Sequence, residues 1–463
     1  MAYLVIILFV LGYAAIAFER KLSIDRSAIA LVTGTLVWLC IALGSDTIYP
    51  VLPSFQDYLQ TYPNASVMEF VSQNELIKHL GKISEIIFFL LGTMAIIEII
   101  DSHGCFNVLS KLIKTNDKIK LLWIFSLLSF FMSAVLGNIA TTVIMITLMW
   151  KMVSGENTRW YFASMILIAA NAGGVWSPIG NVTTIMLWIG ENVSTLNIVF
   201  QLIVPCLISM LVPLVFISLN MRGVTTPISH PARTLSMVPT TDRERWIILI
   251  TGIGGLLFVP VFRAVTHLQP YVGVLLVLGI MWIMTEIMHR KKENELKMRL
   301  TLAGIIKKVN TPTLFFFLGI LLAVAGLESA GYLKFAGVFF SENVRSILAI
   351  NTLVGLLSSV VDNVPLVATV MGMFDIVSTE AQAAVSDPVK AAYMKLFMRD
   401  GTFWGLLTYC SGIGASIFLI GSTAGIAAMR LAKIEFKWFV KKISWLVFVG
   451  YLLGATAYYL MLR

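Results

Sequence analysis

The sequence predicts an all-α polytopic membrane protein with two inverted-topology repeats, each containing a re-entrant helical hairpin and a broken transmembrane helix. Three observations predict it: an apolar composition, long apolar runs, and a segment order that occurs twice. Hydrophobic residues fill 58% of the 463 positions, and charged residues only 13%. A soluble chain usually carries about 25% charged residues, and one of this length could not bury so much apolar surface in a single core.

Nearly uncharged runs recur along the whole chain, and a helix needs about 20 such residues to cross the hydrocarbon core. They cover roughly 3–18, 28–44, 83–100, 121–150, 160–190, 198–220, 246–262, 271–288, 313–330, 346–374, 402–429 and 443–462. Arg20 and Lys21 follow the first run, whereas a signal peptide carries its positive charge in front. We therefore interpret the first run as a membrane span.

The distribution of positive charge predicts the topology. With the N-terminus outside, 25 of the 34 Lys and Arg fall on the inside, as the positive-inside rule requires. The inside segments are then 19–27, 101–120, 151–160, 221–245, 289–312 and 430–442. Run 121–150 begins and ends inside, and run 346–374 begins and ends outside. Each is too long for one crossing and too short for two, so both are predicted to be re-entrant hairpins.

Three stretches occur twice in the same order. Segment 88–92 matches 315–319 at an offset of 227, and an acid follows nine residues later in both halves. Segment 133–138 matches 358–363 at an offset of 225, and 173–181 matches 414–422 loosely at an offset of 241. This order predicts N-terminal spans in 1–45, a first inverted repeat in 83–220, connecting loops and spans in 221–312, and a second repeat in 313–463. Together they are expected to form one transport unit.

Inverted repeats place a substrate site near the membrane midplane, where helices are broken. The breaks are predicted near 137–142, 172–181, 362–365 and 412–423, and Asn171 and Ser416 belong to the same lining. Neutral oxygens at such breaks suit a small hard cation such as sodium, while half-helix N-termini suit an anion. The predicted cation and proton ligands are Asp362, Asn363, Asn138, Thr141, Thr142, Ser177, Asn181, Thr183, Thr184, Ser358, Ser422 and Thr423. Close helix packing is the competing explanation for each Ser and Thr.

Acidic residues supply the exchangeable charge. A carboxylate inside a membrane is costly and usually functional, which singles out Asp362. It can hold either a proton or a metal cation, and competition between the two is the minimal device for exchange. Glu98 and Asp101 form a second acidic pair, which we predict to be a proton path. For Asp101, solvation at the membrane interface is an equal alternative.

Other functional classes are not favoured by the sequence. No P-loop or catalytic cluster is visible, so neither an ATP-driven pump nor an enzyme is indicated, and no cofactor is expected beyond transported sodium or lithium ions and protons. The net charge of +9 is explained by the inside loops rather than by nucleic acid. We expect the four cysteines to be buried free thiols and the five histidines, which form no cluster in the sequence, to be solvated.

Taken together, these segments resemble the NhaD-type sodium/proton antiporters of the ion transporter superfamily. The resemblance is carried most specifically by 83–92, 171–180, 358–367 and 420–425. It implies exchange of cytoplasmic sodium or lithium for external protons, with sodium bound at the predicted site. It also implies a multi-pass protein surrounded by lipid in a bacterial inner (plasma) membrane or a chloroplast envelope, and a possible homodimer.

Two positions depart from the pattern of that family. Gly137 and Asn138 stand where the family typically has Asp-Asn, and Asn181 stands where it typically has Asp. Both departures remove a carboxylate from the predicted site. An alternative is therefore a related secondary carrier of an anion, such as a carboxylate or arsenite, although no Lys or Arg lies within the predicted site to hold it.

Overall fold

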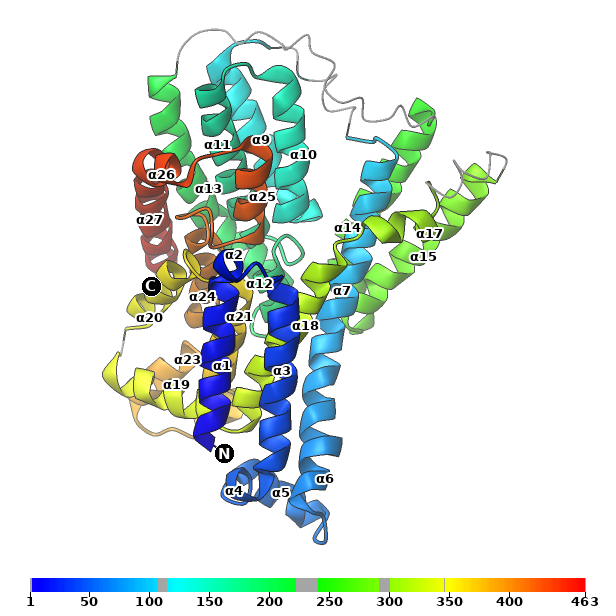
Figure 1. Cartoon of the computed structure of the whole chain (residues 1–463). Coiled ribbons are helices and arrows are strands. Elements are labelled where there is room, and N and C mark those ends of the chain that lie inside the picture. Colours follow the sequence, from blue (N-terminus) through cyan, green and yellow to red (C-terminus); the bar gives the residue numbers. More distant parts are fainter. Residues whose placement is uncertain are drawn as a thin grey trace. The chain divides into compact units, whose positions relative to one another are not determined.

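The computed structural model describes residues 2–106, 113, 115–221, 240–290, 300–344 and 346–462. Within those ranges the chain is helical and contains no strand (Figure 1). Parts of the predicted inside loops 101–120, 221–245 and 289–312 lie outside the described residues, as does His230. The chain divides into two compact units, each made of segments that are distant in sequence.

The first unit contains Met1–Leu91, Asn310–Arg345 and Val364–Asp375. Its helices are α1 (Ala2–Ala17), α2 (Glu19–Leu22), α3 (Arg26–Leu43), α4 (Ser45–Ile48), α5 (Pro53–Thr61), α6 (Val67–Glu69), η1 (Phe70–Glu75), the start of α7 (Leu76–Ser102), α18 (Thr311–Ser329), α19 (Tyr332–Asn343) and nearly all of α21 (Asn363–Met373). Helices α3 and α18 approach closely because Gly34 and Gly319 face each other, and a Cβ on Gly34 would overlap the Gly319 carbonyl. Trp38 adds a hydrogen bond to the Leu322 carbonyl at 2.9 Å.

A buried polar cluster closes the end of α18 in this unit. The Ser329 hydroxyl donates to the Glu75 carboxylate at 2.7 Å and lies 2.5 Å from the Tyr49 hydroxyl. Burial raises the pKa of Tyr49 to about 12, so its phenol keeps its proton and donates to Ser329. His79 lies 3.6 Å from the same carboxylate. The cluster therefore ties η1 and α7 to α18 and to the turn after α4.

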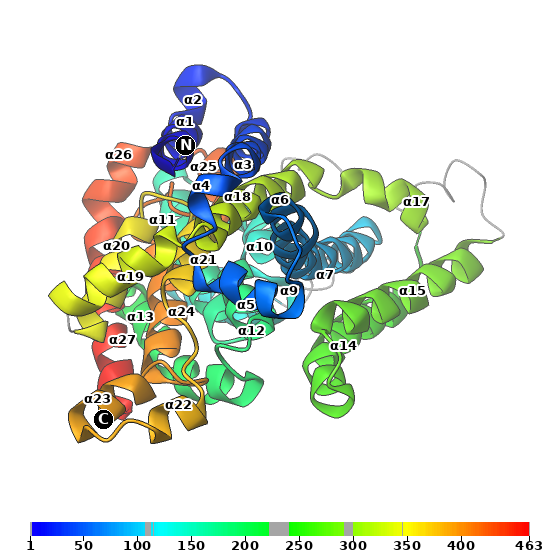
Figure 2. The same ribbon diagram turned by 90° about the horizontal axis from the view of Figure 1, so that it is seen from below.

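The second unit contains Gly92–Val309, Ser346–Asn363 and Ile376–Arg463. Its helices, besides the end of α7, are α9 (Lys118–Leu136), α10 (Asn138–Met152), α11 (Glu156–Val175), α12 (Val182–Ile189), α13 (Thr195–Asn220), α14 (Asp242–Thr266), α15 (Pro270–His289), α17 (Leu302–Ile305), η2 (Ile306–Lys308), α20 (Ile347–Ser358), α22 (Thr379–Ala383), α23 (Pro388–Lys395), α24 (Thr402–Gly414), α25 (Thr423–Ala432), α26 (Phe436–Phe439), η3 (Val440–Ser444) and α27 (Trp445–Met461). Helices α14 and α15 run side by side in both views (Figures 1 and 2).

Helix α11 forms the centre of the second unit. Every residue of α11 from Phe162 to Val175 is buried, and α9, α10, α13, α24 and α25 all pack against it. Its last two turns are rich in Ala and Gly, which allow neighbouring backbones to come close. A helix that is buried all round has no lipid-facing side, so its apolar residues serve internal packing.

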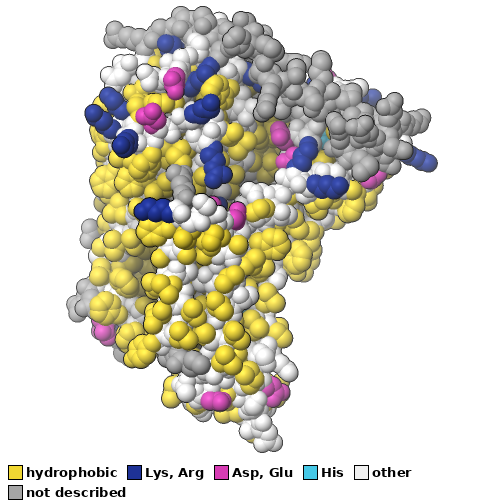
Figure 3. Space-filling view, in the orientation of Figure 1, with side chains coloured by type: hydrophobic (Ala, Val, Ile, Leu, Met, Phe, Trp, Pro, Cys, Tyr) yellow, Lys and Arg dark blue, Asp and Glu magenta, His cyan; other side chains and the backbone are white. Residues whose placement is uncertain are grey.

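The exterior of the protein is suited to lipid. Eight helices within the described residues are long and apolar enough to cross a membrane. Large apolar side chains such as Phe200, Ile250 and Ile283 are at least 64% exposed. Figure 3 shows hydrophobic side chains over broad areas of one face, with Lys and Arg in smaller groups. The chain is an all-α, multi-pass integral membrane protein, as the composition predicts.

Two expectations about titratable side chains have different outcomes. All four cysteines are buried and free, as expected, and burial raises the pKa of the Cys105 thiol to about 12. The expectation of solvated histidines is wrong, because His79, His103 and His289 are buried and only His267 is exposed among the described histidines. His103 and His289 are each other's partners and lie 186 residues apart, which is too distant to be visible in the sequence.

Candidate cation-binding site

The first helix pair of the candidate site breaks at a glycine. Helix α9 ends at Leu136 and α10 begins at Asn138, and Gly137 between them has φ +78° and ψ 158°. This backbone region is essentially restricted to glycine. The Asn138 amide donates to the Gly180 carbonyl at 3.1 Å, which holds the break against the segment that follows α11.

A second break separates α11 from α12. Residues 176–181 are not helical, and the chain here returns close to α9. The Ser177 hydroxyl donates to the Ala134 carbonyl at 2.5 Å, and a Cβ on Gly180 would lie 2.8 Å from the Ser133 carbonyl. Only glycine permits such an approach, so the position of the break is set by backbone contact.

The second half of the chain has a corresponding pair of breaks. Helix α20 ends at Ser358 and α21 begins at Asn363, while α24 ends at Gly414 and α25 begins at Thr423. The Ser358 hydroxyl donates to the Ser411 carbonyl at 2.7 Å. A Cβ on Gly421 would overlap the Ser358 carbonyl. The turn that carries Asp362 is thereby held against the segment 415–422.

Three contacts occur at the same sequence offsets in both halves. First, a Cβ added to Gly173 would overlap the carbonyl of residue 130, and one added to Gly414 would overlap that of residue 355. Second, a Cβ added to Gly180 would lie too close to the carbonyl of residue 133, and one added to Gly421 would lie too close to that of residue 358. Third, the hydroxyl at 133 binds the carbonyl at 170, and the hydroxyl at 358 binds that at 411. All use the offsets 225 and 241 found in the sequence.

A chain of amide and hydroxyl groups links the two halves inside the second unit. Asn138 donates through Nδ2 to the Asn171 Oδ1 at 2.9 Å, and Asn171 donates to the Ser416 hydroxyl at 2.8 Å. The Ser422 hydroxyl lies 3.5 Å from the same Asn171 nitrogen and accepts from the Gly425 amide at 3.0 Å. All four of these side chains are buried. Asn171 therefore joins the start of α10 to the segment before α25.

Four buried polar groups near the starts of α10 and α12 have no hydrogen-bond partner among the described residues. They are the hydroxyls of Thr141, Thr142 and Thr183 and the Nδ2 of Asn181. The three threonines are fully buried, in the first turns of α10 and α12. Leaving a buried polar group unpaired costs about 1–3 kcal/mol, and buried groups of this kind are normally paired with protein, water or an ion. Thr184 differs, because its hydroxyl is 3.5 Å from the Val175 carbonyl.

The charged residue of the predicted site lies at the second break. Asp362 is half-buried and immediately precedes Asn363, the first residue of α21. Asn363 is buried, and Thr423 is half-buried at the start of α25. Asp362 interacts with other groups in the protein. These three residues bring a carboxylate, an amide and a hydroxyl to the second pair of breaks.

The predicted proton path lies at the end of α7. The Ser102 hydroxyl donates to the Glu98 carboxylate at 3.1 Å, and Lys308 lies 3.8 Å from that carboxylate. Lys308 also donates to the Ser102 hydroxyl at 2.8 Å. Asp101 is exposed, whereas Glu98 is half-buried. The Glu98 carboxylate is therefore held by Ser102 and Lys308, whereas Asp101 is accessible to solvent.

Two residues have a larger place in the site than the sequence indicated. Asn171 and Ser416 were part of the predicted lining but not of the predicted ligands, yet Asn171 connects Asn138 to Ser416. Their position within two apolar runs was a usable signal, because a buried amide needs partners. Ser177 and Ser358 both donate to carbonyls, so they at least hold the breaks in place.

Comparison with known proteins identifies the family of the chain. Residues 6–398 match the family model described as citrate transporter (CitMHS). Sodium/proton antiporter 1 of Arabidopsis thaliana is 36% identical over 98% of this chain and 71% of its own length, and sodium/proton antiporter 2 is 33% identical over 98% of both. The Na(+)/H(+) antiporter NhaD of Vibrio cholerae is 26% identical over 99% of this chain and 91% of its own. The chain therefore belongs to the citrate transporter family and, within it, to the NhaD-type sodium/proton antiporters of the ion transporter superfamily.

Proposed function

We propose that this protein exchanges cytoplasmic sodium or lithium ions for external protons across a bacterial inner (plasma) membrane. It is a transporter and not an enzyme, and the antiporter names of its relatives support sodium and protons as the substrates. The observation that carries the proposal is the group of unpartnered threonine hydroxyls beside the Asn138–Asn171 chain. These buried oxygens are the ligands that a small hard cation prefers.

The architecture that serves this function is a pair of inverted repeats. The three contacts that recur at offsets 225 and 241 support the repeats. The distribution of Lys and Arg supports opposite orientations in the membrane. In this arrangement α9–α10 and α20–α21 are re-entrant hairpins that enter from opposite faces, and α11–α12 and α24–α25 are the broken helices.

Within this site, Asp362 carries the exchange. Its carboxylate binds a proton from one side of the membrane and releases it when sodium binds, because one carboxylate cannot hold both ligands. The oxygen shell of the cation is completed by Asn138, Asn181, Thr141, Thr142 and Thr183.

Glu98 conducts the proton between the site and the inner face, where Lys308 keeps the Glu98 carboxylate in position. Asp101 is the solvent-exposed end of that path.

Everted membrane vesicles from cells without their own sodium exchangers test this function. A pH-sensitive dye reports collapse of a respiration-generated proton gradient when sodium, lithium or potassium is added between pH 7 and 9. We expect sodium and lithium to collapse the gradient and Asp362→Asn to abolish the response. The matched control is Asp375→Asn, which removes an exposed acid that pairs with Lys334 at 3.2 Å.

The same vesicles distinguish the anion carrier. The family description and the helix N-termini at Asn138 and Val182 are the observations that favour it. Uptake of labelled succinate or arsenite, with no response to any cation and with the protein present in the membrane, would establish that reading and reject antiport.

A further inference from the structure

Two fully buried histidines meet at the end of α7. The Nε2 atoms of His103 and His289 are 2.9 Å apart, and the rings are stacked with centroids 5.1 Å apart and planes 18° apart. Both side chains have 0% exposure. His103 follows the last residue of α7, and His289 is the last residue of α15. The pair therefore joins the ends of two helices that are far apart in the sequence.

The surroundings assign the protons of this pair. His103 Nδ1 lies 2.6 Å from the Ile99 carbonyl, which can only accept, so Nδ1 carries a proton. The Nε2 of neutral His103 is then an acceptor, and His289 Nε2 donates to it. One added proton leaves this bond intact, because one ring still presents an N–H donor and the other still presents an unprotonated nitrogen. A second further proton makes both rings imidazolium and brings two N–H groups face to face, which breaks the bond.

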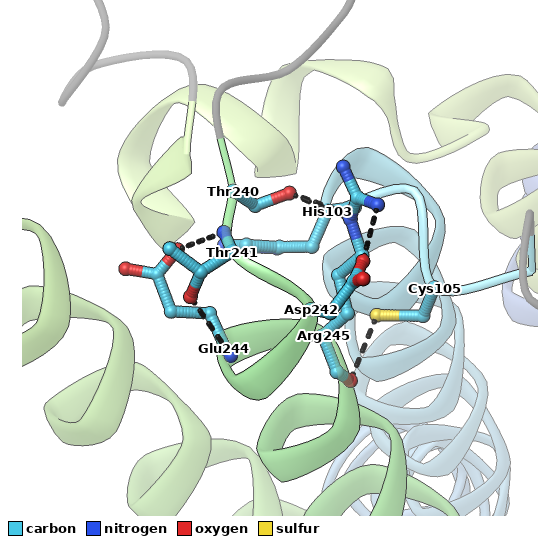
Figure 4. A network of polar contacts seen from close by, with 7 residues as sticks. All are labelled: His103, Cys105, Thr240, Thr241, Asp242, Glu244 and Arg245. Atoms are coloured by element: carbon cyan, nitrogen blue, oxygen red, sulfur yellow. Dashed lines mark hydrogen bonds and ion pairs between the residues drawn. The ribbon is translucent and has the colours of Figure 1, made fainter.

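A network of hydrogen bonds fixes the turn that holds His103 (Figure 4). Thr240 donates to the His103 carbonyl at 3.1 Å and accepts from Arg245 Nε at 3.0 Å. Cys105 donates to the Arg245 carbonyl at 3.3 Å. The start of α14 is thus bound to the same turn as the end of α15, and the three helices meet around the histidine pair.

Repulsion between the two rings opposes a second added proton in this buried setting. The charged and titratable groups described on the turns that meet here are Glu98 and Asp101 on α7, Cys105 after it, Asp242, Arg243, Glu244 and Arg245 on α14, Glu286 and Arg290 at the end of α15, and Lys307 and Lys308 on η2. Arg245 forms a 3.0 Å ion pair with Asp242. Two imidazolium groups buried in contact repel each other strongly.

We propose that the His103–His289 pair is a pH-sensitive latch for the inner end of α7, and this proposal rests on the proton path proposed above. His103 lies directly after Asp101 and Ser102, so the latch holds the turn that carries the Glu98–Ser102–Lys308 contacts. Closed, with at most one added proton, it keeps that path formed. Opened by a second added proton, it releases the turn and lowers exchange.

The sign of the pH effect follows from the proton count. The closed pair binds fewer protons than the open pair, so raising the pH favours closure and acidification favours opening. Histidine is the side chain whose ordinary titration lies between pH 5 and 8, so the opening is sought within that range. The backbone bonds that open are those of His103 to Ile99, Gly104 to Asp101 and Cys105 to Ile100.

Hydrogen–deuterium exchange of the purified full-length protein tests the latch without relying on transport. The exchange rates are first corrected for the intrinsic pH dependence of exchange. The protection of residues 99–106 in the wild type should then fall about tenfold between pH 7.5 and 5. This fall is equivalent to about 1.4 kcal/mol, the size expected for lost hydrogen bonds. His289→Gln should stay protected throughout, because a glutamine amide can either donate to His103 or accept from it. His289→Phe keeps a stacked ring without the bond and should be unprotected at every pH.

Controls and transport measurements complete the test. His267→Asn changes an exposed histidine with φ +58°, a conformation that asparagine tolerates, and should retain the wild-type transition. In the vesicle assay, His289→Gln should keep its sodium response at an acid pH where the wild type has lost it. A wild-type transition in His289→Gln, or constant wild-type protection from pH 7.5 to 5, would overturn the latch. Absence of sodium exchange in the wild type would instead reject the proposed function and leave the protection result to decide the latch.

Discussion

The break at Gly137 and the break before Asn363 are held by the same backbone contacts, yet they present different chemistry. At the first break the residue before the asparagine is glycine with φ +78°, and at the second it is Asp362, whose φ is not positive. The segments that oppose them also differ, since Asn181 precedes α12 where Ser422 precedes α25. In the proposed site, one half is neutral and the other carries the acid.

The backbone contacts determine where the helices break, whereas the side chains at each break determine which chemical groups are present. The close approaches at Gly173 and Gly414 depend only on the absence of a Cβ, so they set where each break lies. The side chains at the break are then free to vary. A site with neutral ligands on one side and one carboxylate on the other still offers a cation oxygen ligands and a single exchangeable proton.

The largest effect should come from filling the shared backbone contacts. In Gly173→Val the new Cβ would overlap the Phe130 backbone, and in Gly414→Val it would overlap the Gly355 backbone. Each change should destabilise the fold by about 3 kcal/mol. Thermal unfolding of the detergent-solubilised protein measures this, with Gly254→Val as the control because nothing lies within 4 Å of a Cβ there. Harmless substitution in one half alone would break the equivalence of the two halves.

Restoring an acid in the neutral half sharpens the comparison. Gly137→Asp forces a side chain into φ +78° and should cost about 1–3 kcal/mol. Asn181→Asp meets no such barrier, because Asn181 has φ −142° and ψ 142°. Its carboxylate would lie at the N-terminus of α12, where negative charge is favourable, and would add an acidic ligand for sodium. The rise in unfolding temperature on adding sodium should therefore be larger than in the wild type. Equal destabilisation of the two variants at high sodium would contradict the backbone explanation.

Removing one unpartnered hydroxyl should affect stability and binding in opposite directions. Thr183→Val keeps the shape of the side chain and removes a buried group without a described partner, so the fold should gain about 1 kcal/mol without sodium. The sodium concentration for half-maximal exchange should rise about tenfold, equivalent to ~1.4 kcal/mol. Thr408→Val is the control, since the Thr408 hydroxyl binds the Trp404 carbonyl at 2.8 Å. A lower stability with unchanged sodium dependence would assign Thr183 to packing.

The last comparison concerns the serines at matching helix ends. Ser329 lies in the buried cluster with Glu75 and Tyr49, while Ser102 contacts Lys308, whose side chain is 53% exposed. Ser329→Ala should cost about 1–2 kcal/mol, and Ser102→Ala less than about 1 kcal/mol. Thermal unfolding compares the two directly. A larger loss of stability for Ser102→Ala would mean that the contacts of Ser102 with Glu98 and Lys308 are stronger than those of Ser329 with Glu75 and Tyr49.

The sequence predicts the helical breaks well because the signal for each is local. Gly137 and the runs of Gly, Ser and Asn after Ala172 and Ser411 interrupt apolar stretches, and the helices end at or near those positions. The order of the matching segments is also local information. The three recurring contacts then follow from the offsets, although their geometry could not be read from the sequence.

Long-range partnerships could not be predicted. The hydrogen bond between Asn171 and Ser416 joins residues 245 positions apart, and the His103–His289 pair spans 186 positions. No periodicity or motif links such residues, because their proximity is produced by the packing of α7, α11, α15 and α24. For the same reason His103 and His289 were expected to be solvated at the ends of spans, whereas the structure buries both.

Proton release on sodium binding tests the central claim most directly. Sodium chloride is added to purified, weakly buffered protein near neutral pH, and the change in pH is followed, with choline chloride as the control salt. Competition for Asp362 predicts a saturable release of protons with sodium and lithium, absent with choline and lost in Asp362→Asn but not in Asp375→Asn. Saturable sodium binding without proton release, or release that persists in Asp362→Asn, would contradict exchange through this carboxylate.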